Sequence, residues 1–468
     1  MNRVIPSMKK SIKILIWLYL ALLLGEGALR KWVFPSFSDQ LLIVRDPVVL
    51  AIYALALTNG LFPWNRFVLV TAALAVLSAL VSILGGHSNL LIVAYGLRIN
   101  YLHLPLIWIM GRVLDRRDVE RIGAGLLVTA IPMSLIMVQQ FRAPMDAFIN
   151  RGVGHDEVGQ LYGADGHIRP PGLFAFITGP QLFFPLCAAF FFDEIGGAKR
   201  LPWYLLIASG LAIAIALPVS ISRTVMLGTV VVALAFLCAL PFSSTRLTAL
   251  MRPLLLLACV GVALSFLPVF RQGTAAFMMR WDTAAVDTDG AAWGGVIDRT
   301  VNGFTNPYYF MRMAPLLGHG IGTGSNVVAR LTSGEVGFLL AEEEWGKVLL
   351  ELGPVLGLAF IVFRIVLTGW LGLRAWRELR THRNALPLLI FAATGLTVLQ
   401  GQWAPPTVLG FAVAGAGLLL AALNPSPSDR KILHHAAASS AAPVPRTVPR
   451  VPTASGRRLP SVLKIIPR

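Results

Sequence analysis

The chain has 468 residues, of which 56% are hydrophobic and only 13% are charged. Soluble globular domains usually have about 25% charged residues, so this composition excludes an ordinary water-soluble protein. The formal net charge of +17 does not indicate a nucleic-acid-binding protein, because the Lys and Arg residues lie in short clusters between apolar segments and in the C-terminal tail.

Apolar runs recur along the chain, separated by short polar breaks. Because about 20 apolar residues cross a hydrocarbon core roughly 30 Å thick, these runs predict an all-α polytopic membrane protein of about twelve transmembrane helices. The first run follows Lys9 and Lys10 like a signal peptide, but it lacks a convincing small-residue cleavage site, so we expect a retained helix. The expected helices span residues 12–25, 41–58, 67–84, 89–111, 122–139, 171–192, 201–219, 223–241, 252–269, 346–372, 386–401 and 406–424.

Basic residues favour one side of the predicted membrane. Short cytoplasmic loops are enriched in Lys and Arg, so the pattern predicts cytoplasmic termini and two long extracytoplasmic loops, at about 140–170 and about 270–340, the larger one between helices 9 and 10. Residues 1–424 would form the membrane domain, and residues 425–468 a disordered, basic, cytoplasmic tail rich in Ser, Pro, Ala and Arg. The clusters assigned to the cytoplasm are Arg3, Lys9 and Lys10; Arg66; Arg112, Arg116, Arg117 and Arg121; Lys199 and Arg200; Arg246 and Arg252; Arg374, Arg377, Arg380 and Arg383.

Two arginines at the outer ends of predicted helices are candidates for binding a phosphate group. Arg169 precedes Gly172 where the first long loop re-enters the membrane, and Arg223 lies at the outer end of the eighth helix. A guanidinium is permanently charged and presents a fork of donors that matches phosphate oxygens. The alternative is that both arginines anchor the chain to lipid headgroups.

The end of the larger loop carries a glycine-rich stretch that includes Gly318, His319 and Gly320. Glycines let the backbone approach a ligand closely, and a histidine can act as a donor or as a base. Glycine-rich turns are common in all proteins, so this stretch indicates a ligand site only together with its neighbours.

Adjacent carboxylates follow at Glu342, Glu343 and Glu344. Like charges disfavour one another's ionisation, which could poise one of the three as a general base. Helical spacing would place Glu343, Lys347 and Glu351 on one face, so the segment could equally be a self-satisfied ion network.

Charged residues inside a membrane are costly and are functional candidates by default. Arg98, near the middle of the fourth helix, has no obvious local partner and could line a polar cavity, whereas adjacent Arg45 and Asp46 are expected to form a structural pair. The charged cluster at residues 26–31 lies beside Trp32 at interface depth, which is typical of structural anchoring.

The order of these features resembles the O-antigen ligase and Wzy-type polymerase superfamily of bacterial surface-polysaccharide assembly, over residues 10–424. In the family, a histidine often stands nine places before the Glu of the Glu-x-Gly motif, which is Glu351 here; this chain has Glu342 at that place. Because the histidine is associated with the ligase branch, its replacement favours a polymerase or an exopolysaccharide branch. The matching motifs are Arg169, Gly172 and Phe174; Ser222 and Arg223; the stretch from Gly318 to Gly322; and Glu351 with Gly353.

The resemblance implies a metal-independent glycosyltransferase of the bacterial inner membrane that needs no cofactor. Its donor would be a glycan on undecaprenyl diphosphate, its acceptor a glycan hydroxyl, and its further partners membrane lipids, a flippase and a chain-length regulator. The implied catalytic residues are Arg169, Arg223, His319, Glu342, Glu343 and Glu344, and the implied substrate-binding residues are Arg98, Gly172, Gly318, Gly320 and Lys347.

Three alternatives stay open. The first is an O-antigen ligase acting on lipid A-core, and the second is a non-catalytic polysaccharide transporter or permease whose mid-membrane charges line a substrate path. Neither a repeat of fixed period nor a pair of Gly-broken helices in corresponding halves is evident, which disfavours the transporter. The third is a structural subunit that scaffolds an export complex.

Overall fold

The computed structural model describes residues 6–85, 89–153, 160–198, 200–242, 261, 265–286, 294–325, 327–329, 340–341 and 343–425. Within these ranges, seven helices are long and apolar enough to cross a bilayer, and three shorter helices are also apolar. This confirms an all-α membrane protein. The count of twelve helices stays a prediction, because the helix expected at 252–269 lies largely outside the described residues, as does the tail beyond Pro425.

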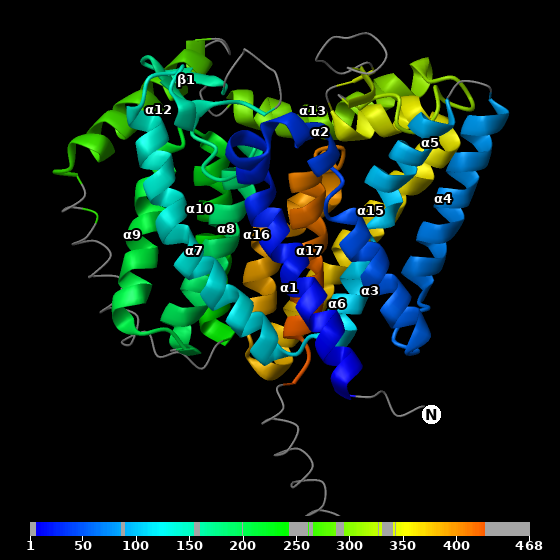
Figure 1. Ribbon diagram of the computed structural model, residues 1–468, viewed down its shortest axis with the longest axis horizontal. Coiled ribbons are helices and arrows are strands. Elements are labelled where there is room, and N and C mark those ends of the chain that lie inside the picture. The colour runs from blue at the N-terminus through cyan, green and yellow to red at the C-terminus, as the bar shows by residue number, and fades with distance from the viewer. Residues whose placement is uncertain are drawn as a thin grey trace, which may run out of the picture. The chain divides into compact units, whose positions relative to one another are not determined.

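The apolar helices run side by side between two faces of a bundle (Figure 1). They are α1 (Pro6–Ala28), α3 (Asp46–Thr58), α4 (Arg66–Leu84), α5 (Leu90–Leu97), α6 (Leu106–Val113), α7 (Arg116–Arg142), α8 (Thr178–Asp193), α9 (Trp203–Val219), α10 (Arg223–Ala239), α15 (Glu344–His382), α16 (Leu386–Gln400) and α17 (Pro406–Ala422). Local signals set several starts. Asn65 accepts a hydrogen bond from the Val68 N–H before α4, and Asp115 and Asp118 form a capping box at the start of α7.

The two faces of the bundle carry different structures (Figure 1). One face, here named the hairpin face, carries short extra elements. The opposite face, named the terminal face, is where α1 begins and α17 ends. The elements of the hairpin face are α2 (Ser38–Leu41), the antiparallel pair of β1 (Tyr162–Ala164) and β2 (His167–Ile168), α12 (Pro268–Val286) and α13 (Gly294–Met313).

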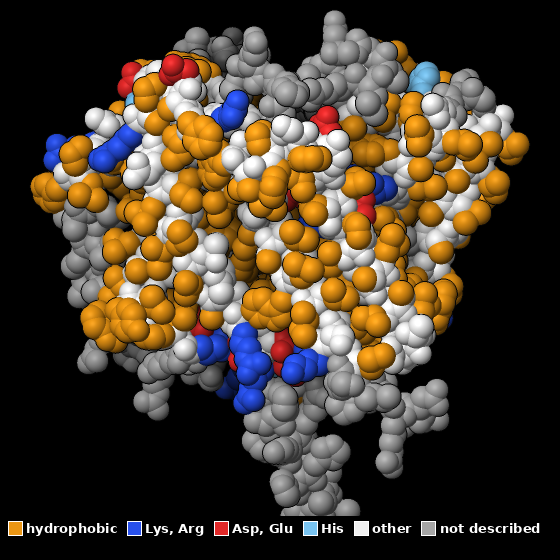
Figure 2. All heavy atoms as spheres, viewed as in Figure 1, with side chains coloured by type: hydrophobic (Ala, Val, Ile, Leu, Met, Phe, Trp, Pro, Cys, Tyr) orange, Lys and Arg blue, Asp and Glu red, His pale blue; other side chains and the backbone are white. Residues whose placement is uncertain are grey.

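Basic residues mark the helix ends at the terminal face. Arg66 opens α4, Arg116 opens α7, and Arg383 follows α15. Figure 2 shows Lys and Arg side chains gathered on this face below a broad hydrophobic band. The clusters that the sequence assigned to cytoplasmic loops therefore lie together wherever the structure describes them.

Both long predicted loops contain regular structure. The first holds the β1–β2 hairpin, and the second holds α12 and α13. α12 packs against α9 and β1, and α13 packs against α15. The described parts of these loops therefore lie on the bundle and cover its hairpin face.

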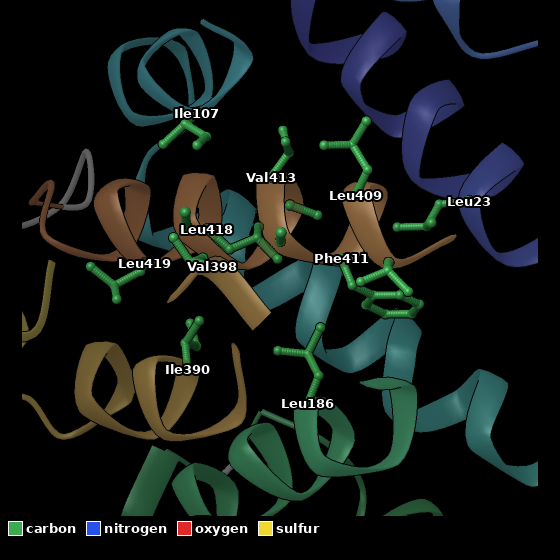
Figure 3. Close-up of a cluster of buried hydrophobic side chains, with 14 of the residues drawn as sticks. Leu23, Ile107, Leu186, Ile390, Val398, Leu409, Phe411, Val413, Leu418 and Leu419 are labelled. Atoms are coloured by element: carbon green, nitrogen blue, oxygen red, sulfur yellow. The ribbon is translucent and has the colours of Figure 1, made fainter. Parts of the chain in front are cut away.

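The core of the bundle forms around α17, in which every residue from Val408 to Ala422 is buried. Figure 3 shows its side chains surrounded by side chains of other helices. Association of helices in lipid depends on close van der Waals packing, since the lipid tails are as apolar as the side chains. The residues around α17 in this view include Leu23 of α1, Ile107 of α6, Leu186 of α8, and Ile390 and Val398 of α16.

Two helices that the sequence predicted as continuous are interrupted, which corrects that prediction. The segment 89–111 is split into α5 and α6 by a π-helical stretch, Arg98–Leu102, and by Pro105. α15 is kinked at Gly353, whose φ of +75° is left-handed, directly before Pro354. The kink folds residues 344–352 back against the rest of α15. This is evident at Gly357, where an added Cβ would lie only 2.9 Å from Leu349 Cα.

The kink makes Gly353 difficult to replace. A methyl group there would overlap the carbonyl oxygen of Leu316, lie 2.9 Å from Gly318 N, and require an L-residue at positive φ. We expect Gly353→Ala to lower the free energy of unfolding by about 2–3 kcal/mol in detergent denaturation. The control is Gly369→Ala in the same helix, where no atom lies within 4 Å of the new methyl group. This control should instead stabilise by about 0.5–1 kcal/mol, and equal effects of the two variants would contradict the account.

Candidate functional site

Four charged side chains of α15 form a buried group, here named the α15 ion cluster. Glu344 accepts a bond of 2.9 Å from Arg364 Nη1, and its other carboxylate oxygen lies 3.0 Å from Lys347 Nζ. Glu351 lies one helical turn beyond Lys347, and its Oε1 accepts a bond of 2.8 Å from the Gly324 N–H. All four side chains are buried, so their charges are compensated mainly by one another.

Arg364 fixes the cluster to the end of α16. Its guanidinium donates to the carbonyl oxygens of Val398 at 3.0 Å and Gly401 at 2.8 Å, and it lies 3.8 Å above the Trp403 ring. The side chain is 0% exposed. The kink at Gly353 brings Arg364 and Glu344 together although 20 residues separate them.

The glycine-rich stretch closes the kink from the outside. The N–H groups of His319 and Gly320 donate to the carbonyl oxygens of Leu350 and Glu351, at 2.8 and 3.0 Å. The kink and Pro354, which has no N–H, would leave these carbonyls without helical partners. The backbone donors predicted to contact a ligand therefore bond to the chain itself, and the exposed His319 side chain faces solvent.

α13 covers the first turns of α15. Asn306 donates to Glu343 at 3.0 Å, and Phe304 packs edge-on against Trp345. Because α15 begins at Glu344, Glu343 precedes the helix and bonds to α13. The predicted row of Glu343, Lys347 and Glu351 is thus corrected: the pair is Glu344 with Lys347, three residues apart.

A second buried group, here named the α1–α3 network, starts at Glu26. One Glu26 oxygen lies 3.4 Å from Arg30 Nη1, and the other lies 3.2 Å from Arg45 Nε. Arg45 also donates to Tyr19 at 3.4 Å and to the carbonyl of Pro406 in α17. Arg45 is therefore paired with Glu26 and not with its neighbour Asp46, which corrects the expected structural pair.

The network continues through a histidine to Arg98. Tyr19 bonds to His103 Nδ1 at 3.2 Å, and His103 Nε2 lies 3.0 Å from Asp46 Oδ1. The other Asp46 oxygen pairs with Arg98 Nε, and Arg98 Nη2 donates to the Leu42 carbonyl at 2.6 Å. Arg98 thus has a partner distant in sequence, and its side chain is still 12% exposed. Figure 2 shows a few acidic and basic side chains within the hydrophobic band.

Tyr95 lies in the same region. It precedes Arg98 by one turn, Arg98 Cζ lies 5.4 Å from the Tyr95 ring centroid, and the neighbouring Gly96 packs against Gly322. The hydroxyl is buried and has no hydrogen-bond partner among the described residues. We name the α15 ion cluster, the α1–α3 network and Tyr95 together the central polar site.

Lys31 lies beside this site in a π-helical turn at the end of α1. It is 0% exposed, donates to the Gly172 carbonyl at 2.8 Å, and lies 4.4 Å from the Trp32 ring centroid. The Gln140 side chain makes two hydrogen bonds to Gly172. Its Nε2 donates to the Gly172 carbonyl at 3.2 Å, and its Oε1 accepts a bond of 2.8 Å from the Gly172 N–H. Lys31 pairs with no carboxylate among the described residues, and Gly172 is held by protein groups on both sides.

An unpaired buried ammonium should destabilise the fold. We therefore expect Lys31→Met to raise the free energy of unfolding by about 1–2 kcal/mol, because Gln140 still satisfies the Gly172 carbonyl. Lys13→Met is the control in the same helix: Lys13 pairs with Asp118 at the terminal face and is 28% exposed, so its loss should lower stability by up to about 1 kcal/mol. Chemical denaturation in detergent measures both, and a loss of stability in Lys31→Met would contradict this assignment.

Arg169 and Arg223 lie near the β1–β2 hairpin. The Arg169 N–H donates to the Leu161 carbonyl at 2.9 Å, and its Nε is buried with no bond to a described residue. Arg223 is half-buried at the start of α10. A Cβ on Gly163 would lie 2.8 Å from Ile221 Cδ1, so the hairpin packs on the turn before Arg223. Figure 1 places this region and α15 on opposite sides of α1.

The predicted site residues thus fall into two groups. Arg98, Gly318, His319, Gly320, Glu343, Glu344 and Lys347 lie in or beside the central polar site; Arg169, Gly172 and Arg223 lie toward the hairpin, and Glu342 lies outside the described residues. Sequence reasoning missed Tyr95 and Arg364. Arg364 stands alone in a long apolar run, a signal that was available.

Basic side chains outnumber acidic ones around the central polar site. This excess favours an anionic ligand or part of one. Within the described ranges, no three His, Cys, Asp or Glu side chains converge as metal ligands would. The basic residues are Arg30, Arg45, Arg98, Lys347 and Arg364, and the acidic residues are Glu26, Asp46, Glu344 and Glu351.

Comparison with protein-family models, with curated proteins and with solved structures finds no match for this chain.

Proposed function

We propose that this protein is a membrane glycosyltransferase that polymerises undecaprenyl-diphosphate-linked oligosaccharide units at the outer face of the bacterial inner membrane. The observation that carries the proposal is the central polar site: a buried, base-rich group of charged side chains inside an apolar helical bundle. Buried charges in a membrane protein are costly and usually serve a substrate or ion.

The positive-inside rule supplies the orientation in this proposal. The basic loop clusters lie at the terminal face, which makes that face, with both termini, cytoplasmic. The hairpin face is then extracytoplasmic. A reaction on a translocated lipid-linked glycan would take place there, under α13.

Arg98 is the first candidate for binding the diphosphate. The isoprenoid chain of the donor stays in the bilayer, so a residue that binds its headgroup has to be accessible, and the Arg98 side chain is 12% exposed. Asp46 and the Leu42 carbonyl hold Nε and Nη2, which leaves Nη1 without a bond to a described residue. Arg169 and Arg223, the candidates from the sequence, would be the second group of phosphate ligands, since a guanidinium pairs with phosphate in a fork.

The reaction requires few catalytic groups from the protein. The diphosphate is an activated leaving group, and fixed cations can stabilise the charge that develops on it. A carboxylate near the acceptor hydroxyl would take its proton as the hydroxyl oxygen attacks the anomeric carbon. Among the residues that the sequence resemblance implies for that role, the structure describes Glu343, Glu344 and His319.

The test is to incubate the purified protein in detergent with an undecaprenyl-diphosphate oligosaccharide and to resolve the products by length. A ladder of multiples, absent in Arg98→Ala and reduced in Arg169→Ala, is the expected result. Single transfer that requires added lipid A-core would make the protein a ligase. No transfer under either condition would overturn the proposal.

The interrupted helices favour one alternative, a polysaccharide transporter. Broken helices that carry charged residues near mid-membrane are typical of secondary transporters, and both α5–α6 and α15 fit this description. Glycan uptake into proteoliposomes, without any change in glycan length, would support this function in place of transfer.

A further inference from the structure

We infer that buried polar atoms of α5 and α15 bind a sugar hydroxyl of the acceptor, with Glu351 as its proton acceptor and with Tyr95 and Lys347 as its hydrogen-bond donors. This inference rests on the proposed function for the reaction, but the sugar site itself has an independent test.

Two buried polar atoms in this region, Tyr95 Oη and Glu351 Oε2, lack hydrogen-bond partners among the described residues. Lys347 Nζ is held by its ion pair with Glu344 Oε2 at 3.0 Å and has further N–H donors. An unsatisfied buried polar group costs about 1–3 kcal/mol, so a group of them indicates a ligand or bound water.

The segment 321–324 links the two helices that carry these atoms. A Cβ on Gly96, next to Tyr95, would lie 2.7 Å from Gly322 N. A Cβ on Gly324 would lie 2.6 Å from Lys347 Cγ and 3.0 Å from Glu351 Oε1. The segment thus touches α5 at one end and the α15 ion cluster at the other.

The chemistry of these atoms selects the ligand. The free carboxylate oxygen of Glu351 requires a donor, whereas a phenol and an ammonium can donate to acceptors. A diphosphate alone would be repelled by Glu344 and Glu351, and a simple cation would be repelled by Lys347. A hydroxyl group both donates and accepts, so neighbouring sugar hydroxyls satisfy both kinds of partner.

Glu351 is better placed than Glu344 to take a proton. Both oxygens of Glu344 face cations, Arg364 at 2.9 Å and Lys347 at 3.0 Å, and Trp403 N lies 3.5 Å from Oε1. Cations this close stabilise the ionised form and weaken the base. Glu351 Oε1 accepts one backbone N–H, and its Oε2 is free of hydrogen bonds to described residues.

The step balances as a single displacement. The acceptor O–H bond breaks as its proton moves to Glu351 Oε2. The oxygen forms the new bond to the anomeric carbon, and the bond from that carbon to the diphosphate oxygen breaks. The electron pair leaves with the diphosphate, whose charge faces Arg98.

Binding and turnover separate the two parts of the inference. Calorimetric titration of the purified protein with a free, lipid-less repeat-unit oligosaccharide should show at least about tenfold weaker binding in Tyr95→Phe. Glu351→Gln should bind within about threefold of wild type but elongate lipid-linked substrate at least about 100-fold more slowly. The controls are Tyr309→Phe, at an exposed tyrosine of α13, and Glu378→Gln, in the part of α15 near the terminal face. Both should match wild type in binding and in elongation.

The outcomes distinguish the sugar site from the proposed polymerase reaction. If wild type elongates and both site variants behave like wild type, the inference is overturned while the proposed function stands. If wild type does not elongate but binds the oligosaccharide in a Tyr95-dependent way, the sugar site stands and the proposed reaction falls. No oligosaccharide binding by wild type overturns the site. If Glu351→Gln does not fold, the elongation rate of Glu351→Asp tests the proton acceptor, and oligosaccharide binding by Tyr95→Phe tests the sugar site.

Discussion

Replacing Arg364 with methionine should lower the free energy of unfolding by about 3–5 kcal/mol, the usual cost of removing one partner of a buried ion pair. Methionine fills similar volume, so the loss would come from Glu344 and from the carbonyls of Val398 and Gly401, which lose their donor. The guanidinium is 0% exposed, so water cannot replace it without opening the bundle. Denaturant titration in detergent micelles, followed by tryptophan fluorescence, measures the change.

The matched control is Arg374→Met on the same helix. Arg374 is exposed and lies 5.0 Å from the Trp370 ring, so its loss should change stability by less than about 1 kcal/mol. The double variant Glu344→Gln with Arg364→Met removes both charges and should recover part of the loss. Equal losses in Arg364→Met and Arg374→Met would mean that the ion cluster does not stabilise the kink.

Asp46→Asn should have the second-largest effect, a loss of about 3 kcal/mol. This is the low end for breaking a buried ion pair, because 12% of Arg98 and 13% of Asp46 remain exposed. The substitution keeps the shape but leaves Arg98 without a counter-charge and weakens the bond to His103. Thermal unfolding in detergent measures it.

A second carboxylate near the start of α3 supplies the control for Asp46→Asn. Asp39 in α2 is exposed, and Asp39→Asn should change stability by no more than about 0.5 kcal/mol. Adding Arg98→Met to Asp46→Asn should restore part of the loss, since no uncompensated charge then remains. A double variant as unstable as the sum of its parts would show that the two side chains do not interact.

The apolar runs predicted the helices because hydropathy is a local property of the sequence. Each expected helix in the described ranges overlaps a helical segment, but several bounds differ. α1 spans Pro6 to Ala28 where 12–25 was expected, α8 begins at Thr178 where 171 was expected, and α15 continues to His382 where 372 was expected. The breaks were not predicted. The π-helical stretch at Arg98–Leu102 and the kink at Gly353 depend on contacts with α3 and with the glycine-rich stretch, which no local pattern encodes.

The site was only partly predictable for the same reason. The sequence identified charged residues, but their partners lie far away in the chain: Asp46 and Arg98 are 52 residues apart. Helical spacing predicted Glu343 on one face with Lys347 and Glu351, but Glu343 precedes α15, and Glu344 pairs with Lys347 instead. Tyr95 gave no signal, because an aromatic residue in an apolar run usually belongs to the core or the interface.

The central claim is that Arg98, in the α1–α3 network, binds the diphosphate of a lipid-linked donor, and native mass spectrometry tests it most directly. The purified protein would be titrated with undecaprenyl diphosphate and, separately, with undecaprenol. We expect wild type and Arg374→Gln to bind the diphosphate and not the alcohol, and Arg98→Gln to bind it at least about tenfold more weakly, as the loss of one charge-assisted bond requires. Equal binding of the two lipids, or unchanged diphosphate binding in Arg98→Gln, would contradict the account.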